Sequence, residues 1–238
     1  ASYVLGQENF TAIEEALDQD SLSSSDQIAL DTTNDRLFIR TDERLLIFDV
    51  RNAGSANSTL CGESTTGLAN GMNASCVLGQ ENFTDELLAT DADGFREAAN
   101  VNNGVVYDSV DERLFVGDGG NNRVVVFDLS GTISNGMDAS FVLGQANLTA
   151  NVVPAAYTLS ANQFTSSVTN SLPRSLSYDT TNKRLIIGDA NGARYLVFDL
   201  SSGITNGMDA SFVLGHSSLT SPANAAFIVG ENQSNFFS

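Results

Sequence analysis

The sequence predicts an all-β fold in which blades of four antiparallel strands are arranged as in a β-propeller. The first observation is a block with the pattern Asn-Gly-Met-Asx-Ala-Ser-x-Val-Leu-Gly, which occurs at residues 70–80, 135–145 and 206–216. The second is a block of two apolar runs around a polar turn, at residues 28–39, 105–116 and 176–187. Repeated units of this size are typical of radial or stacked architectures. The chain of 238 residues is 42% hydrophobic, so it can bury a sizeable core.

Each repeat supplies four strands in a fixed order. The 28–39 block and its copies read as strand, Asp/Thr/Asn turn, strand, because β-forming residues flank residues that favour tight turns. A third strand follows at 123–128 and 194–199, and within 40–49 in the first copy. The Ser-x-Val-Leu-Gly run supplies the fourth strand after an Asn-Gly turn. Four consecutive strands per repeat predict one propeller blade.

The apolar runs favour the propeller over two alternatives. Residues 124–127 are continuously apolar, as expected for a strand whose sheet is covered on both faces. A β-solenoid would need a shorter repeat, and a string of sandwiches would not repeat so closely.

The run from Arg113 to Val124 resembles the NHL repeat, and more narrowly the long bacterial variety with a Val-Leu-Gly-Gln strand in each unit. The third unit keeps Asp189 and Arg194 but has Gly192 where the pattern has Asn, and the first unit lacks the Asn turn. The resemblance implies a six-bladed propeller with a central channel that serves as a binding or scaffolding surface.

The number of blades poses a problem. A single domain over residues 1–238 contains three units, at about 28–80, 104–145 and 174–215, together with an orphan strand at 2–7 and a tail at 219–238. Three blades cannot close a ring, and an open arc exposes two apolar faces. The chain is therefore a piece of a longer protein, or two copies close a ring, or copies join head to tail into a filament.

The two ends of the chain are the candidates for self-association. The orphan strand lacks a blade of its own, so we expect it to add to a sheet edge of another copy. The tail contains a run that resembles the Val-Leu-Gly strand. The candidate residues are Tyr3, Val4, Leu5, Phe227, Ile228 and Val229.

Three long segments connect the repeats, at residues 8–27, 81–103 and 146–173. They either cover the outer rim of the blades or form contact surfaces between subunits. Within the second segment, residues 84–89 resemble a capped helical turn with acidic residues at its amino end.

Composition limits the function. With 29 acidic and 11 basic residues, the net charge is −18, which disfavours nucleic acid as a partner. No apolar run is long enough for membrane insertion. One histidine and two cysteines cannot build a structural zinc site, and His216 stands where its repeats carry Gln. We expect no enzymatic activity, no catalytic residue and no metal or cofactor, with calcium at the Asp/Asn turns as the one alternative to ordinary turn bonding.

Two features point to an extracellular or cell-surface location. Cys61 and Cys76 form a disulfide or remain buried thiols, and the disulfide would require an oxidising compartment. Sequons for N-glycosylation occur at six positions, three of them directly after a Val-Leu-Gly-Gln strand. The six are Asn9, Asn57, Asn73, Asn82, Asn147 and Asn232.

The resulting hypothesis is an extracellular scaffolding protein whose partners are other copies of itself. The alternatives are a propeller module that binds a peptide or glycan, and an excised fragment of a larger NHL-repeat protein.

Overall fold

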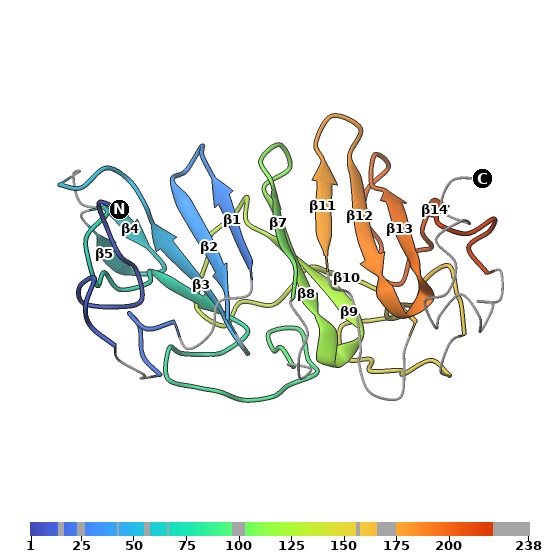
Figure 1. Cartoon of the computed structure of the whole chain (residues 1–238), viewed down its shortest axis with the longest axis horizontal. Coiled ribbons are helices and arrows are strands. Elements are labelled where there is room, and N and C mark those ends of the chain that lie inside the picture. The colour runs from blue at the N-terminus through green and yellow to red at the C-terminus, as the bar shows by residue number, and fades with distance from the viewer. Residues whose placement is uncertain are drawn as a thin grey trace.

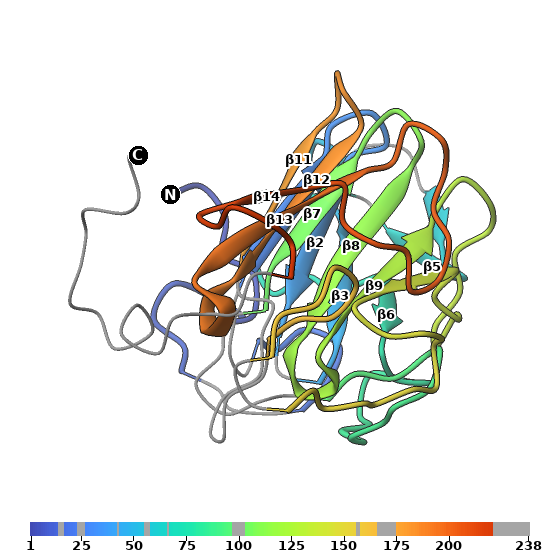
Figure 2. The ribbon, with the colours of Figure 1, turned by 90° about the vertical axis from the view of Figure 1, so that its right-hand side faces the viewer.

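The computed structural model describes residues 1–13, 17–22, 27–41, 43–54, 58–65, 67–96, 103–155, 158–165 and 175–220. In these residues the fold is all-β, with three antiparallel four-stranded sheets standing side by side (Figure 1). The view from the side shows the sheets one behind another (Figure 2). They form an open array and do not close into a ring.

The three sheets share one topology, in which three consecutive strands are followed by a short outer strand. The first contains β1 (Gln27–Asp31), β2 (Arg36–Arg40), β3 (Leu45–Asp49) and β6 (Cys76–Leu78). The second contains β7 (Val105–Asp108), β8 (Arg113–Asp118), β9 (Arg123–Asp128) and β10 (Phe141–Leu143). The third contains β11 (Leu176–Asp179), β12 (Arg184–Asp189), β13 (Arg194–Asp199) and β14 (Phe212–Leu214).

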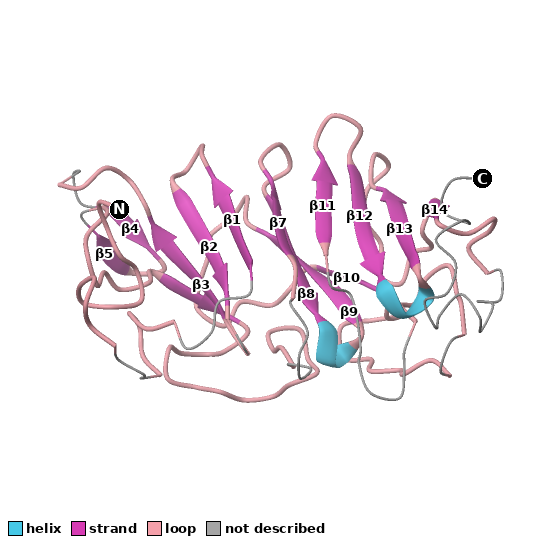
Figure 3. Cartoon of the chain, viewed as in Figure 1, coloured by secondary structure: helices cyan, strands magenta, loops and turns pink. Residues whose placement is uncertain are grey.

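The remaining elements are small. β4 (Ser58–Leu60) and β5 (Glu63–Thr65) form a hairpin inserted into the first repeat. Two 3-10 turns, η1 (Gly119–Asn121) and η2 (Ala190–Gly192), are the only helical elements among the described residues (Figure 3). Each lies between the second and third strands of its sheet, and the corresponding hairpin of the first sheet, Arg36–Asp49, is two residues shorter than Arg113–Asp128.

The turn between the first two strands of each sheet is built in the same way. In the first sheet, Oδ1 of Asp31 accepts hydrogen bonds from the backbone N–H groups of Thr33 and Asn34. Asp35 then adopts a left-handed conformation with φ 53°, as do Glu112 and Lys183 at the equivalent positions. The carbonyl of Asp35 accepts a hydrogen bond from the N–H of Val50 at 2.8 Å, which holds this less favourable conformation.

The core lies between the sheets. For each sheet we call the side turned toward the next sheet in the chain its forward face, and the opposite side its rear face. The forward face of the first sheet and the rear face of the second share one cluster of fully buried side chains, including Phe38, Ile47, Leu114 and Phe127. The second and third sheets share an equivalent cluster. β7 lies between β1 and β11, so the first strands of the three sheets are neighbours.

Within the chain, residues 2–7 form no strand with a described sheet and lie against the first sheet, where Leu5 packs on its rear face. Their pairing with another copy stays a prediction. One expectation is wrong. Residues 84–89 form no helical turn. The N–H of Leu87 instead donates to Oε1 of Gln80 at 3.0 Å, because this glutamine follows a strand and orders the next segment.

Candidate functional site

The junctions between consecutive repeats show which contacts hold one sheet against the next, and so which contacts an added sheet would have to make. A paired hydrogen bond, which we call the Asn-Gly latch, recurs at each junction. Oδ1 of Asn135 accepts a bond from the N–H of Val77 at 3.0 Å, and the N–H of Gly136 donates to the Val77 carbonyl at 3.1 Å. Asn206 and Gly207 hold Val142 in the same way, at 2.9 and 3.1 Å. The latch thus ties the outer strand of one sheet to the loop before the outer strand of the next.

Before the first sheet, the latch holds the N-terminal segment instead of the outer strand of a described sheet. Oδ1 of Asn70 accepts a bond from the N–H of Val4 at 3.0 Å, and the N–H of Gly71 donates to the Val4 carbonyl at 3.2 Å. Val4 therefore occupies the position that Val77 and Val142 occupy at the other junctions.

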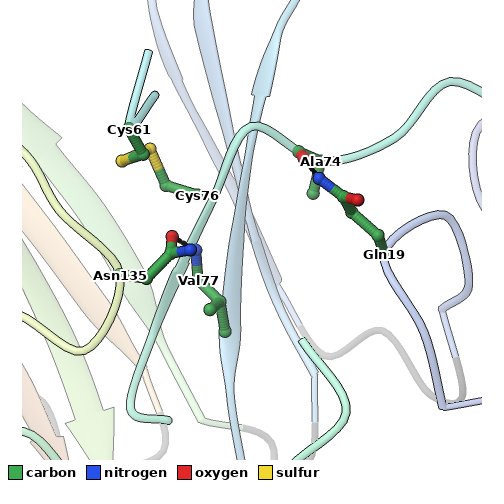
Figure 4. The surroundings of a disulfide bond; sticks show 6 residues. All are labelled: Gln19, Cys61, Ala74, Cys76, Val77 and Asn135. Atoms are coloured by element: carbon green, nitrogen blue, oxygen red, sulfur yellow. Dashed lines mark hydrogen bonds between the residues drawn. A yellow bond between two sulfur atoms is a disulfide. The ribbon is translucent and has the colours of Figure 1, made fainter. Parts of the chain in front are cut away.

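The connecting segments repeat a second contact. The carbonyls of Gln19, Ala92 and Ala161 each accept a bond from the alanine before an outer strand, at 2.8 Å in all three cases. Figure 4 shows the first of these contacts, where Nε2 of Gln19 also donates to the carbonyl of Ala74 at 2.8 Å. The described parts of these connections therefore pack against their own sheets, and a role as contact surfaces between subunits stays a prediction.

Each connection also inserts one apolar side chain beside the glycine that ends the outer strand. Phe95 and Phe164 are fully buried against Gly79 and Gly144, and a Cβ on either glycine would overlap the neighbouring ring. Leu22 takes the same position beside Gly6. The described part of the N-terminal segment therefore makes the same contacts as the later connections.

A buried arginine fixes each connection to the third strand of its sheet. Arg123 pairs with Asp118 at 2.6 Å, both side chains being fully buried, and donates to the carbonyls of Asp91, Gly94 and Leu148. Burial raises the pKa of the Asp118 carboxyl, and the positive charge of Arg123 opposes that shift. In the third sheet Arg194 and Asp189 form the equivalent pair at 2.7 Å.

Aromatic contacts join the first strand of each sheet to the forward face of the sheet before it. Tyr107 lies 5.3 Å from Phe38, and Tyr178 lies 5.2 Å from Phe115, measured between ring centroids. The hydroxyl of Tyr107 also accepts a bond from Arg36 at 2.9 Å. Burial raises the pKa of Tyr107 to about 12, so its hydroxyl stays neutral in the physiological range.

No described sheet packs on the forward face of the third sheet, where Val197 is buried but three other apolar side chains are exposed. Tyr195, Phe212 and Leu214 are 43, 52 and 53% exposed. Their counterparts Leu45, Cys76 and Leu78 in the first sheet are fully buried beneath the second. The apolar character of the face is thus retained where no sheet of the described chain packs on it.

The rear face of the first sheet is covered only in part. Its outer portion packs against Leu5 and Leu22 of the N-terminal segment. On β1, Ile28 and Leu30 are 65 and 54% exposed. In the second sheet, Val105 and Tyr107 occupy these two positions and pack in the core shared with the first sheet.

The two ends of the array therefore present the two halves of one sheet–sheet junction. Among the candidate association residues, Tyr3, Val4 and Leu5 lie at the first end, while Phe227, Ile228 and Val229 lie outside the described residues. The latch was not predicted, although the recurrence of Asn-Gly at a constant distance before each outer strand was the available signal.

The disulfide is formed. Cys61 and Cys76 are bonded, with their Cα atoms 5.5 Å apart (Figure 4). Cys76 lies on β6, where the other repeats carry Phe141 and Phe212, so the bond ties the inserted β4–β5 hairpin to the outer strand of the first sheet.

Four of the six sequons lie in the described residues, and their asparagines are all exposed: Asn9, Asn73, Asn82 and Asn147. Three share one geometry, in which Oδ1 of the asparagine accepts a bond from the sequon threonine hydroxyl, at 2.8 Å for Asn9. Asn57 and Asn232 lie outside the described residues.

The polar residues considered as calcium ligands bond to their own turns. Oδ1 of Asp179 accepts bonds from the N–H groups of Thr181 and Asn182, and Oδ1 of Asp108 accepts one from Val110. Over the described ranges, no group of three or more His, Cys, Asp or Glu side chains could hold a metal ion. His216 contacts the carbonyl of Gly192 at 2.9 Å.

No helix within the described parts of the chain could span a membrane. No protein-family model matches the sequence, and a comparison with curated proteins found no match.

Proposed function

We propose that the chain is a structural module of the NHL-like β-propeller type that acts outside the cell and builds a scaffold by associating with copies of itself. The observation that carries the proposal is the exposed forward face of the third sheet. Tyr195, Phe212 and Leu214 remain apolar although no described segment covers them fully.

Exposed apolar patches of this kind mark interaction sites in soluble proteins. The partner is expected to be another copy, because the rear face of the first sheet is equivalent to the rear faces that the second and third sheets pack on the forward face of the sheet before them. Such a contact joins two different surfaces, so it is heterologous and leads to a ring or to an open filament.

The disulfide supports the proposed location, because disulfides persist in oxidising compartments. The exposed sequons are compatible with glycosylation there.

Mass photometry over a dilution series tests the proposal. The wild-type chain should form oligomers that dissociate on dilution, and Tyr195→Glu should weaken association at least about tenfold, because it places a charge in the apolar forward face on β13. Val153→Glu is the matched control, since Val153 is 59% exposed and lies outside both end faces. A wild-type chain that stays monomeric at every concentration would contradict self-association and favour the ligand-binding module or the excised fragment.

A further inference from the structure

We propose that two copies join by strand exchange, in which residues 3–7 of one copy replace β14 of the other and pair with its β13. This inference rests on the proposed function, because it specifies how the end sheets of two copies meet.

Residues 3–7 and β14 are equivalent segments with complementary contacts. Val77 and Val142 each have two sets of contacts: a ladder with the third strand of their own sheet, and the Asn-Gly latch from the next repeat. Val213 of β14 pairs with Leu196 in a ladder, but no latch reaches it among the described residues. Val4 has the latch, from Asn70 and Gly71, but belongs to no ladder. Each segment thus has half of the contacts of a complete outer strand.

The two segments compete for one position. Suppose that the third sheet of one copy and the first sheet of another copy pack together as consecutive sheets do within the chain. Val213 of the first copy and Val4 of the second copy then fall at the same position. Both cannot occupy it. The junction therefore requires one of the two strands to leave.

The contacts indicate that β14 is the strand that leaves. Residues 3–7 continue into a segment that is anchored to its own first sheet, through two 2.8 Å hydrogen bonds between Gln19 and Ala74 and through Leu5 and Leu22 in the core. β14 is a strand of three residues, and its Phe212 and Leu214 side chains are half exposed.

Exchange gives a defined register. By equivalence with β14, Tyr3 would lie opposite Val197, Val4 opposite Leu196, and Leu5 opposite Tyr195. Val4 would then have both the ladder and the latch. The same arrangement brings Ile28 and Leu30 of one copy toward the exposed forward face of the other, so burial of that face drives the exchange.

A pair of introduced cysteines tests the register. In the double variant Tyr3→Cys/Val197→Cys, exchange places the two thiols on facing residues of different copies. The native cysteines do not interfere, because they are bonded to each other. Mild oxidation should produce disulfide-linked chains longer than dimers, and peptide mapping should identify the 3–197 bond. Each single-cysteine variant should stop at a dimer.

A second pair tests whether β14 must leave. Val197 and Phe212 face each other on β13 and β14, so Val197→Cys/Phe212→Cys should form a bond within one chain and lock β14 in place. The locked chain should be monomeric in mass photometry, whereas the Phe212→Cys single variant should still associate.

The outcomes separate the two proposals. Association of the locked chain at wild-type strength, or wild-type oligomers in which the 3–197 bond does not form, would overturn strand exchange and leave self-association intact. Absence of wild-type oligomers at every concentration would overturn both.

Discussion

At the scale of single residues, the array is joined by a small set of polar contacts repeated at each junction. The side chain of Asn135 bonds the backbone of Val77 at a partly buried position, and Asn206 does the same for Val142. An asparagine suits this role because its amide oxygen accepts a bond without bringing a charge into the junction.

Replacing this asparagine should loosen the junction. Asn135→Ala leaves the N–H of Val77 without its acceptor, so we expect the free energy of unfolding to fall by about 1–2 kcal/mol. Urea denaturation followed by circular dichroism measures the change. Asn135→Asp retains an acceptor oxygen and should lose less; equal losses in the two variants would argue against the latch.

The buried pair of Arg123 and Asp118 should give a pH-dependent effect. Arg123→Gln leaves a buried carboxylate without its partner, and we expect a loss of about 3–5 kcal/mol near neutral pH. The pKa of Asp118 in the folded chain is raised, so the folded state binds more protons at this site than the unfolded state does. Stability from this group therefore increases as the pH falls, and the deficit of the variant should shrink as the pH is lowered from neutral.

The double variant Asp118→Asn/Arg123→Gln is the control for this experiment. Since it lacks the carboxyl group, the difference in stability between Arg123→Gln and this double variant isolates the Asp118 titration. A deficit of Arg123→Gln that stays constant over the same pH range would show that the carboxylate is not responsible.

At the scale of elements, the sheets stay together because each connection returns to cover the sheet before the next one begins. Phe95 and Phe164 are fully buried at the ends of the outer strands, each against a glycine with positive φ. The β4–β5 hairpin is the only such insertion in the described residues, and the Cys61–Cys76 bond fixes it to β6.

A side chain at one of these glycines should disrupt the connection. Gly79 has φ 87°, and an added Cβ would overlap the Phe95 ring, so Gly79→Ala should destabilise the fold by about 2–4 kcal/mol. Gly131→Ala is the matched control, because nothing lies within 4 Å of the Cβ it would add. Thermal unfolding of both variants measures the difference, and similar melting temperatures would refute the close packing of Phe95.

At the scale of the whole molecule, a strongly acidic chain exposes an apolar surface, the forward face of the third sheet. Its net charge of −18 makes copies repel one another at long range, whereas the exposed residues of the third sheet favour contact at short range. The balance between these two effects should depend on ionic strength.

Association should therefore strengthen with salt. Raising sodium chloride from about 20 mM to about 300 mM shortens the screening length from roughly 20 Å to less than 8 Å, which weakens repulsion but not apolar burial. We expect a higher oligomer fraction at the higher salt concentration in mass photometry at constant protein concentration. Dissociation by salt would indicate that ion pairs carry the contact instead.

Much of the fold could be predicted because the repeats are long and closely similar. The positions of all twelve strands of the three large sheets follow from blocks such as 105–116 and 135–145, in which apolar runs alternate with turn residues. The disulfide was one of two readings, since only two cysteines exist and Cys61 lies in an insertion. The β4–β5 hairpin was missed, because its polar residues have no counterpart in the other repeats.

The placement of the N-terminal segment could not be predicted in the same way. Residues 2–7 have the sequence of an outer strand, which led to the expectation that they seek an edge elsewhere. The sequence alone does not show the Asn-Gly latch, whose bond between Val4 and Asn70 joins positions 66 residues apart.

The sequence by itself determined the strands, their order within each sheet and the need for sheets covered on both faces, because local β-propensity and turn chemistry repeat with the units. Only the tertiary structure decided which faces are covered and by what. Burial of Phe38 or exposure of Phe212 depends on whether a neighbouring sheet is present, and nothing in the local pattern of either strand encodes that neighbour.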